Sequence, residues 1–263
     1  MRIASFQVGF DDAESKEERV ERVLGTVDGC RGADLVLLPE LWPTGFFSFD
    51  RFAEEAEPVD GPIVQALADR ARALRAYIHT GSFVGRDEDG RLANTSVLLG
   101  PEGNTLGVYR KIHLFGYGSR EKEVLTPGSE VVTADTAFGT VGMATCYDLR
   151  FPEQFRIMVD QGAEFFLICS AWPYPRLEHW LMLNRVRALE NQVFLVSANC
   201  VGVDEGVRFC GHSMIVDPWG SILAGSGDEQ MIIWSEIDPQ KVREVRDVFP
   251  PLRDRVLGRR REE

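Results

Sequence analysis

Short apolar runs bounded by turn residues recur along the chain and predict its β-strands. Continuous or alternating apolar runs are typical of strands that are buried on one or both faces. Turn signals separate several of these runs, and Asp87-Glu88-Asp89-Gly90 predicts a hairpin between two of them. The predicted strands span residues 3–8, 35–38, 77–84, 95–99, 105–109, 131–135, 140–145, 165–169, 193–198, 213–216, 222–223 and 231–237.

Apolar residues at helical spacing predict helices between these strands. Val20, Val23 and Val27 fall on one face of a segment whose other positions are charged. A second segment is entered through Gly61-Pro62, and proline suits the first turn of a helix. The predicted helices span residues 15–27, 63–74, 153–161, 177–190 and 239–245.

The order of these elements predicts the fold class. Strands occur both in hairpins and in strand–helix–strand units, in two halves of similar style. This pattern is typical of an α/β fold in which two mixed sheets pack face to face with helices on the outer faces, a four-layer αββα sandwich. No linker or low-complexity segment divides the chain, so we expect a single domain over residues 1–263, with residues 250–263 as a C-terminal tail.

Composition narrows the possible partners. The chain has 263 residues, 44% of them hydrophobic, which is enough for a large core. Its formal charge of −12 disfavours binding to nucleic acid or to an anionic membrane. The basic run Arg259-Arg260-Arg261 is followed by two glutamates and is interpreted as a solvated tail. The apolar stretches are too short to span a bilayer.

Cysteine and histidine usage predicts an unmetallated protein with reduced thiols. The first residues read as a strand and not as a signal peptide, so a cytoplasmic location is expected. The cysteines are odd in number and form no CxxC pair: Cys30, Cys146, Cys169, Cys200 and Cys210. No metal-ligand spacing joins the histidines, and neither a metal nor another cofactor is expected: His79, His113, His179 and His212.

Three chemically useful side chains come at or within two residues of the ends of predicted strands. These are Glu40, Lys111 and Cys146. A thiolate can attack a carbonyl carbon, a carboxylate can move the protons, and an ammonium can donate to the oxyanion. The backbone N–H of Tyr147 is a candidate second oxyanion donor. Because a helix is predicted to begin near Cys146, its free N–H groups and dipole are expected to favour the thiolate.

Simpler interpretations exist for each residue. A cysteine at a strand end is often a small buried hydrophobe, and a lysine or glutamate is often solvated. A cysteine–histidine pair is a rival mechanism, since His179 or His212 could approach Cys146 in space. The sequence lacks the Cys-Gly-Ser-Cys pattern of the papain-like enzymes.

The motifs around these residues resemble those of the nitrilase superfamily of carbon–nitrogen hydrolases. The resemblance runs along almost the whole chain, with its motifs in family order. They are Leu37-Leu38-Pro39-Glu40, Tyr109-Arg110-Lys111-Ile112-His113-Leu114, Cys146-Tyr147-Asp148-Leu149-Arg150-Phe151-Pro152-Glu153, Arg187-Ala188-Leu189-Glu190-Asn191-Gln192 and Gly211-His212-Ser213-Met214-Ile215-Val216-Asp217-Pro218-Trp219-Gly220.

The resemblance implies a role for each catalytic candidate. Glu40 would be the general base, Lys111 would stabilise the oxyanion and the intermediate, and Cys146 would be the nucleophile. The family often has a second glutamate before a Pro-Gly turn, and Glu121 stands at the matching offset before Pro127-Gly128. It would position Lys111 and the substrate, with Glu123 as a lesser alternative.

The residues after the nucleophile resemble the branch that contains omega-amidases and deaminated-glutathione amidases. Those enzymes hydrolyse a terminal amide on a substrate that also carries carboxylate and keto groups. Arg150 could pair with such a carboxylate, although a salt bridge to Asp148 or Glu153 is an equal alternative. The segment from Ser170 to Arg176 resembles the bacterial omega-amidase form of this loop. The candidate substrate-binding residues are therefore Arg150, Trp172, Tyr174 and Arg176. Phe46 and Phe47 could close the pocket opposite, with core packing as an equal alternative.

These inferences predict an amidase that releases ammonia through a thioester. The leading substrate is the omega-amide of a 2-oxo dicarboxylate, such as 2-oxoglutaramate. Hydrolysis of an N-carbamoyl compound or a nitrile by the same three residues is an alternative, as is a ligand-binding protein with a retired site. The resemblance also implies a homodimer formed through the helices near the nucleophile, at residues 153–161 and 177–190, which the tail after Pro250 could cross.

Overall fold

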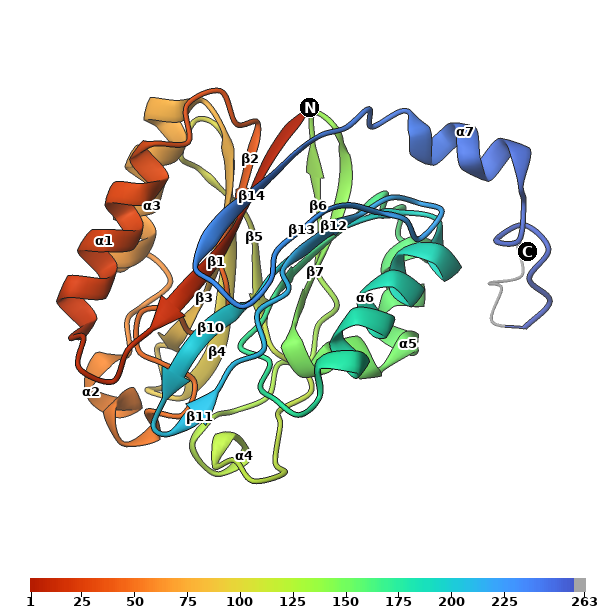
Figure 1. The fold of residues 1–263 in the computed structure, drawn as a ribbon. Coiled ribbons are helices and arrows are strands. Elements are labelled where there is room, and N and C mark those ends of the chain that lie inside the picture. The colour runs from red at the N-terminus through yellow and green to blue at the C-terminus, as the bar shows by residue number, and fades with distance from the viewer. Residues whose placement is uncertain (258–263) are drawn as a thin grey trace.

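Two β-sheets packed face to face between outer helices form the body of the molecule (Figure 1). The computed structural model describes residues 1–257. The first sheet has the strand order β11-β10-β1-β2-β3-β4-β5, with β14 pairing antiparallel to β1. Its strands are β1 (Arg2–Phe10), β2 (Leu35–Leu37), β3 (Tyr77–Arg86), β4 (Leu92–Leu99), β5 (Thr105–Arg110), β10 (Cys200–Asp204), β11 (Val207–Arg208) and β14 (Met231–Glu236).

The second sheet has the order β13-β12-β9-β8-β7-β6. Strands β7, β8 and β9 run parallel, so their carboxyl ends lie at one edge of the sheet. Its strands are β6 (Thr133–Thr136), β7 (Gly139–Thr145), β8 (Phe165–Cys169), β9 (Phe194–Ala198), β12 (Met214–Val216) and β13 (Ile222–Gly225).

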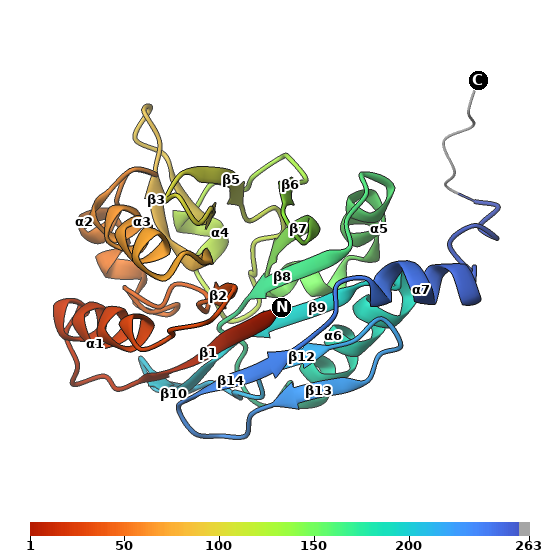
Figure 2. The same ribbon diagram turned by 90° about the horizontal axis from the view of Figure 1, so that it is seen from above.

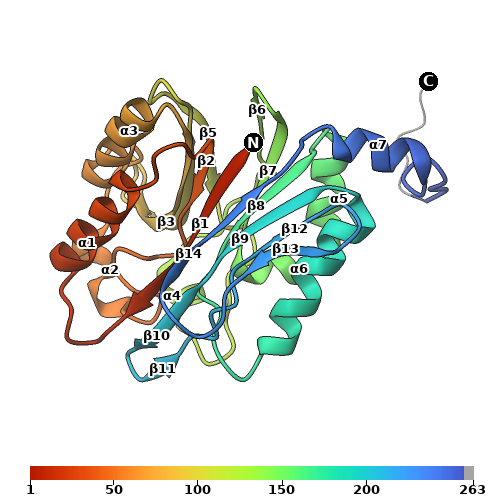
Figure 3. The ribbon, with the colours of Figure 1, turned by 45° about the horizontal axis from the view of Figure 1, so that its top comes forward.

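The helices cover the two outer faces. Figures 1 and 2 show α1 (Lys16–Asp28) and α3 (Pro62–Leu74) side by side against the first sheet. On the other side, α5 (Pro152–Asp160) and α6 (Leu177–Asn191) cover the second sheet. In Figure 3, α7 (Lys241–Val248) projects beyond the sheets on the side of α5. This arrangement confirms the predicted four-layer αββα sandwich.

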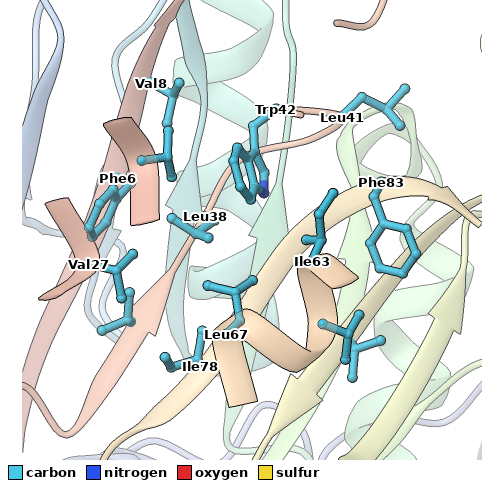
Figure 4. Close-up of a cluster of buried hydrophobic side chains, with 14 of the residues drawn as sticks. Phe6, Val8, Val27, Leu38, Leu41, Trp42, Ile63, Leu67, Ile78 and Phe83 are labelled. Carbon is cyan, nitrogen blue, oxygen red and sulfur yellow. The ribbon is translucent and has the colours of Figure 1, made fainter. Parts of the chain in front are cut away.

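Side chains that alternate in direction along the buried strands supply both the core between the sheets and the core under the helices. In β2 and the residue after it, Leu35 and Leu37 point into the core between the two sheets, whereas Val36 and Leu38 point toward α1 and α3. Successive side chains of a strand face opposite sides, so a continuous apolar run serves two cores at once. Figure 4 shows part of the outer core, where Leu38 lies among side chains of the first sheet and its covering helices.

The sequence missed several short elements. They are too short to show a period, or are interrupted by glycine. In β10, Gly202 has a φ of +84°, and a Cβ atom there would lie 2.1 Å from the Phe10 carbonyl oxygen. The missed elements are β10, β11, α2 (Phe52–Glu55), α4 (Glu121–Val124) and two 3₁₀ turns, Phe49–Arg51 and Cys146–Arg150.

The ends of the chain add two points. None of the helices within residues 1–257 is long and apolar enough to cross a membrane. The basic run Arg259-Arg260-Arg261, and with it the last part of the expected tail, lies outside the described residues.

Candidate active site

Glu40, Lys111 and Cys146 meet between the two sheets. Glu40 follows β2 and Lys111 follows β5 in the first sheet, while Cys146 directly follows β7 in the second. The side chains of Glu40 and Lys111 are closed to solvent, and Cys146 is 6% exposed. The fold therefore brings the three residues, far apart in sequence, to one buried place.

Lys111 is held by two carboxylates. Its Nζ lies 2.8 Å from Glu40 Oε1, 2.9 Å from Glu121 Oε1 and 3.1 Å from Glu121 Oε2. Burial by itself favours the neutral amine, but Glu121 and Glu40 outweigh burial and raise the pKa of Lys111 well above its usual value. Lys111 is therefore an ammonium with three N–H donors. The alternative, Glu123, is exposed and lies 3.7 Å from Arg120.

Each glutamate has further fixed donors. Asn94 Nδ2 donates to Glu40 Oε1 at 2.8 Å and to Glu121 Oε1 at 3.1 Å. The Ala171 N–H donates to Glu40 Oε2 at 2.8 Å, and the Phe115 N–H donates to Glu121 Oε2 at 2.6 Å. Burial raises the pKa of Glu121; Lys111 opposes this effect and Glu40 adds to it.

A close backbone approach places Glu40. Gly81 has a φ of +67°, and a Cβ atom there would lie 2.1 Å from the Pro39 carbonyl oxygen. The Ser82 N–H donates to that same oxygen at 3.0 Å, and the Ser82 hydroxyl accepts the Leu41 N–H at 3.0 Å. Hydrogen bonds with β3 thus hold the backbone on both sides of Glu40. Only glycine fits at position 81.

Cys146 opens a tight turn. It is the first residue of the 3₁₀ turn Cys146–Arg150 and has a φ of +49°, which few residues other than glycine adopt. The turn is fixed at its start by Asp148, whose Oδ2 accepts the Thr145 N–H at 2.8 Å. The Tyr147 N–H lies in the first turn, where backbone donors have no acceptor within the helix.

The surroundings of Cys146 oppose the thiolate that the sequence predicted at this turn. Burial raises the pKa of Cys146 well above its usual value, and Glu40 adds to the rise while Lys111 opposes it. The regular helix α5 begins only at Pro152, so its dipole does not start at the sulfur. Cys146 is therefore a thiol that needs a base.

Asp148 joins the nucleophile turn to the lysine segment. Its Oδ2 accepts the Tyr109 hydroxyl at 2.5 Å, and its Oδ1 accepts the His113 N–H at 3.0 Å. His113 Nδ1 lies 2.8 Å from the same Oδ1. Because Tyr109 and His113 flank Lys111, Asp148 sets the position of the lysine segment relative to Cys146. Neither Asp148 nor Asn94 was singled out from the sequence, although Asp148 lies inside the motif that follows the nucleophile.

A small, mostly apolar cavity opens on Cys146. The space between its walls, counted together with the open solvent at its mouth, is about 290 Å³. It is lined by Phe46, Phe115, Cys146, Tyr147, Arg150, Ala171, Trp172, Pro173 and Arg176.

Two guanidinium groups border this cavity without a carboxylate partner. Arg150 lies over the Trp172 ring at 4.8 Å and donates to His179 Nδ1 at 3.1 Å. Arg176 lies over the Phe115 ring at 5.3 Å. Within residues 1–257, neither arginine forms an ion pair, so the alternative that Arg150 pairs with Asp148 or Glu153 is not observed. Both cations are available to an anion.

The structure separates the other aromatic candidates. Trp172 lines the cavity, and its backbone N–H donates to Asn199 Oδ1 at 2.7 Å. Tyr174 does not line it, because its hydroxyl donates to Asp228 at 3.0 Å. The expected substrate contact of Tyr174 is therefore not supported. Phe46 lines the cavity, whereas Phe47 stacks on Phe209, with 6.0 Å between ring centroids.

The histidine alternative does not match the geometry. His179 accepts from Arg150, and His212 Nδ1 lies 2.7 Å from the Cys210 carbonyl oxygen. No hydrogen bond joins either ring to Cys146 in the described part of the chain. Across residues 1–257, no group of three or more His, Cys, Asp or Glu side chains is arranged as a metal site.

The remaining cysteines are buried and form no disulfide. Burial raises the pKa of Cys169 and of Cys210 to about 12, and that of Cys30 to about 11. Burial also raises the pKa of Cys200, whose Sγ donates to the Ser170 carbonyl oxygen at 3.5 Å. Such thiols stay protonated and unreactive.

Comparison with known proteins places this site in a family. Residues 2–247 match the model of the carbon-nitrogen hydrolase family. A 2-oxoglutaramate amidase of Paenarthrobacter nicotinovorans is 39% identical over 260 residues, which cover 96% of this chain and 88% of that protein. Human omega-amidase NIT2 is 35% identical over 233 residues, covering 86% of this chain and 84% of that protein.

Solved structures of this family are also similar to this chain. Saccharomyces cerevisiae Nit3, a member of branch 10 of the nitrilase superfamily, is similar with a TM-score of 0.87 and 28% identity, covering 100% of this chain and 97% of that one. The fold, the motifs and the matched length point the same way. The chain belongs to the carbon–nitrogen hydrolase family of the nitrilase superfamily.

Proposed function

We propose that this protein hydrolyses the omega-amide of a small 2-oxo dicarboxylate, such as 2-oxoglutaramate, to the acid and ammonia. One observation carries the proposal: Arg150 and Arg176, neither of them ion-paired within the described part of the chain, border the small cavity that opens on Cys146. In a chain with a formal charge of −12, cations without a counter-charge beside a thiol suit an anionic substrate.

Acylation begins with attack of Cys146 Sγ on the amide carbon. Glu40 accepts the thiol proton as the carbon–sulfur bond forms, which makes up for the raised pKa of Cys146. The carbonyl oxygen becomes an oxyanion and accepts from Lys111 Nζ and the Tyr147 N–H. The carbon–nitrogen bond then breaks as Glu40 returns its proton to the nitrogen. Ammonia departs, and the acyl group stays bound to Cys146 as a thioester.

Deacylation reverses these roles. A water molecule attacks the thioester carbon, and Glu40 takes one of its protons. The carbon–sulfur bond breaks, the proton passes from Glu40 to the sulfur, and the carboxylic acid leaves. Glu40 thus ends each half-reaction as it began, and no redox or metal step is required.

Glu121 holds Lys111 in place during both steps. It contacts Nζ with both carboxylate oxygens, at 2.9 and 3.1 Å, while Glu40 contacts it with one. Because two of the contacts go to a single carboxylate, one N–H of Lys111 can turn to the oxyanion without leaving Glu121 unpaired. Glu121 is the positioning carboxylate and Glu40 the base, since Glu40 is the glutamate that interacts most strongly with Cys146.

The cavity and the relatives support this substrate class. Arg150 and Arg176 would bind the carboxylate at the far end of the substrate, while the amide reaches Cys146. Phe46, Tyr147 and Trp172 would exclude bulky substrates from the small space between them. The relatives named 2-oxoglutaramate amidase and omega-amidase NIT2 support this substrate class.

Ammonia release from dialysed enzyme in the presence of a chelator tests the proposal. We expect release from 2-oxoglutaramate and much slower release from neutral amides of similar length. Release of carbon dioxide together with ammonia from N-carbamoyl compounds would identify a carbamoylase instead, and acid formation from nitriles would identify a nitrilase. No release from any amide, nitrile or carbamoyl compound, with Cys146 inert to iodoacetamide, would favour a retired binding protein.

We also propose that the chain forms a homodimer through α5 and α6. Helix α6 buries Trp180 and Ala188 against the second sheet, yet it also exposes apolar side chains on its outer side. A second copy of the same surface is a self-complementary partner for such a patch. The exposed apolar side chains on these helices are Ile157, Met182, Val186 and Leu189.

A further inference from the structure

Asn94 closes a ring of hydrogen bonds around the two glutamates. Its Nδ2 donates to Glu40 Oε1 at 2.8 Å and to Glu121 Oε1 at 3.1 Å. The same two oxygens accept from Lys111 Nζ at 2.8 and 2.9 Å. The ammonium and the amide nitrogen thus bridge the same pair of carboxylate oxygens.

The orientation of the amide follows from its neighbours. Asn94 is fully buried in β4, and its Oδ1 has no hydrogen-bond partner among the described residues. If the amide were turned over, Oδ1 would face two carboxylate oxygens and both of its N–H groups would lose these acceptors. The Lys111 N–H donates to the Asn94 carbonyl oxygen at 2.9 Å, so the backbones of the two bridging residues are also joined.

The charges around this ring do not cancel. When both glutamates are ionised, two buried carboxylates share a single ammonium. Like charges at such close range favour uptake of a proton by one of them. Hydrogen bonds donated to a carboxylate favour its ionised form, and an amide supplies two such bonds without adding an ionisable group.

We infer that Asn94 is a positioning residue: its amide holds Glu40 Oε1 and Glu121 Oε1 together beside Lys111 and disfavours protonation of this carboxylate pair, so that Glu40 can take the thiol proton of Cys146. This role rests on the proposed function of Glu40 as the base. Without the amide bridge, the pair of carboxylates would bind a proton more readily, and the base would be lost over a wider range of acid pH. Binding of the substrate carboxylate at the arginines would be unaffected.

Asn94→Asp tests the inference with little change in volume. The variant replaces both N–H donors with a third carboxyl group, so the acid limb of the kcat/KM profile should move up by about one pH unit or more. At a pH below the midpoint of the wild-type acid limb, the variant should be about tenfold less active than the wild type. The loss should appear in kcat, with KM little changed. The rate of Cys146 alkylation by iodoacetamide should fall over the same pH range.

Ser96→Ala is the matched control. Ser96 lies two residues along β4 on the same face, is equally buried, and has a hydroxyl without a hydrogen-bond partner among the described residues. Its hydroxyl donates no hydrogen bond to either glutamate among the described residues, so its variant should keep the wild-type acid limb. Asn94→Ala, which removes the donors without adding a carboxyl group, covers the case in which Asn94→Asp does not fold.

The outcomes separate this inference from the substrate assignment. An unchanged acid limb and alkylation rate in a folded Asn94 variant would overturn the inference, as would an equal shift in Ser96→Ala. A shifted alkylation profile in an enzyme that does not hydrolyse 2-oxoglutaramate would support the inference while contradicting the proposed substrate. The alkylation reaction needs no substrate, so it reports on Asn94 alone.

Discussion

Lys111 Nζ and Glu40 Oε1 lie 2.8 Å apart, and both side chains are closed to solvent. Such a pair is costly to bury and adds little net stability by itself, because each charge loses its hydration. It is held here because Glu121, Asn94 and Ala171 complete the hydrogen bonds around it. In the proposed mechanism, this arrangement keeps the base and the oxyanion-stabilising cation together in one place.

Glu40→Gln should leave a folded protein with almost no activity. The amide cannot accept the thiol proton, and the raised pKa of Cys146 leaves little thiolate to react without a base. We expect kcat to fall by about 10²–10⁴-fold, the usual contribution of a general base. Steady-state ammonia release measures it, and iodoacetamide labelling of Cys146 should slow in parallel. Activity within about tenfold of wild type would exclude Glu40 as the base.

Lys111→Met should destabilise the fold as well as abolish activity. It leaves Glu40 and Glu121 buried without a cation, and removing one partner of a buried ion pair costs about 3–5 kcal/mol. Urea unfolding gives the free energy of unfolding. A variant as stable as the wild type would show that other groups balance the charges of the two glutamates.

The stability of this variant should depend on pH with a definite sign. Burial raises the pKa of Glu121, and Lys111 no longer opposes that effect. The folded state then binds more protons than the unfolded state, so stability rises as pH falls through the raised pKa and is lost above it. Unfolding at about pH 5.5 and about pH 8 should therefore show the variant to be more stable at the lower pH. The opposite slope would contradict the raised pKa.

Cys146 should be a neutral thiol in the free enzyme at neutral pH. Burial and Glu40 raise its pKa well above the usual value, so the thiolate should form only at high pH. Ultraviolet absorbance of the thiolate during a pH titration, compared with Cys146→Ser, measures this directly. A thiolate band at neutral pH that disappears in Cys146→Ser would show that the turn does activate the sulfur in advance.

Sequence patterns found the catalytic candidates because each stands just after a predicted strand. Strand β8 was predicted with its observed bounds, since five buried residues in a row leave little ambiguity. Glu40, Lys111 and Cys146 were marked by such runs and by family motifs. Asn94 carries no local signal, because its partners come from the segments after β2 and β5 and from α4, and they become neighbours only in the folded chain.

The errors have physical causes of the same kind. Tyr174 follows Pro173, and nothing in the sequence reveals that its hydroxyl reaches Asp228. The state of Cys146 was misjudged because local turn geometry was weighed without the burial that the second sheet imposes. Direction and burial of a side chain are tertiary properties, whereas strand ends are local ones.

Arg150→Leu and Arg176→Leu should weaken binding of substrates that carry a carboxylate. A hydrogen-bonded charge pair contributes about 1.5–3 kcal/mol, so KM for 2-oxoglutaramate should rise about 10–100-fold for the arginine that contacts it. Activity on a neutral amide should change little. Arg150→Lys should not restore KM fully, because an ammonium lacks the planar fork. Equal losses on charged and neutral amides would show that the arginines shape the cavity without selecting a charge.

Leu189→Asp should separate the proposed homodimer into monomers. Leu189 is 49% exposed on α6, and a charge buried there in a dimer would lack a partner. Met231 is similarly exposed, at 44%, but belongs to the first sheet, so Met231→Asp is the matched control. Sedimentation velocity at several concentrations should give a dimer for the wild type and the control and a monomer for Leu189→Asp. A monomeric wild type, or a dimer that persists in Leu189→Asp, would place any interface elsewhere.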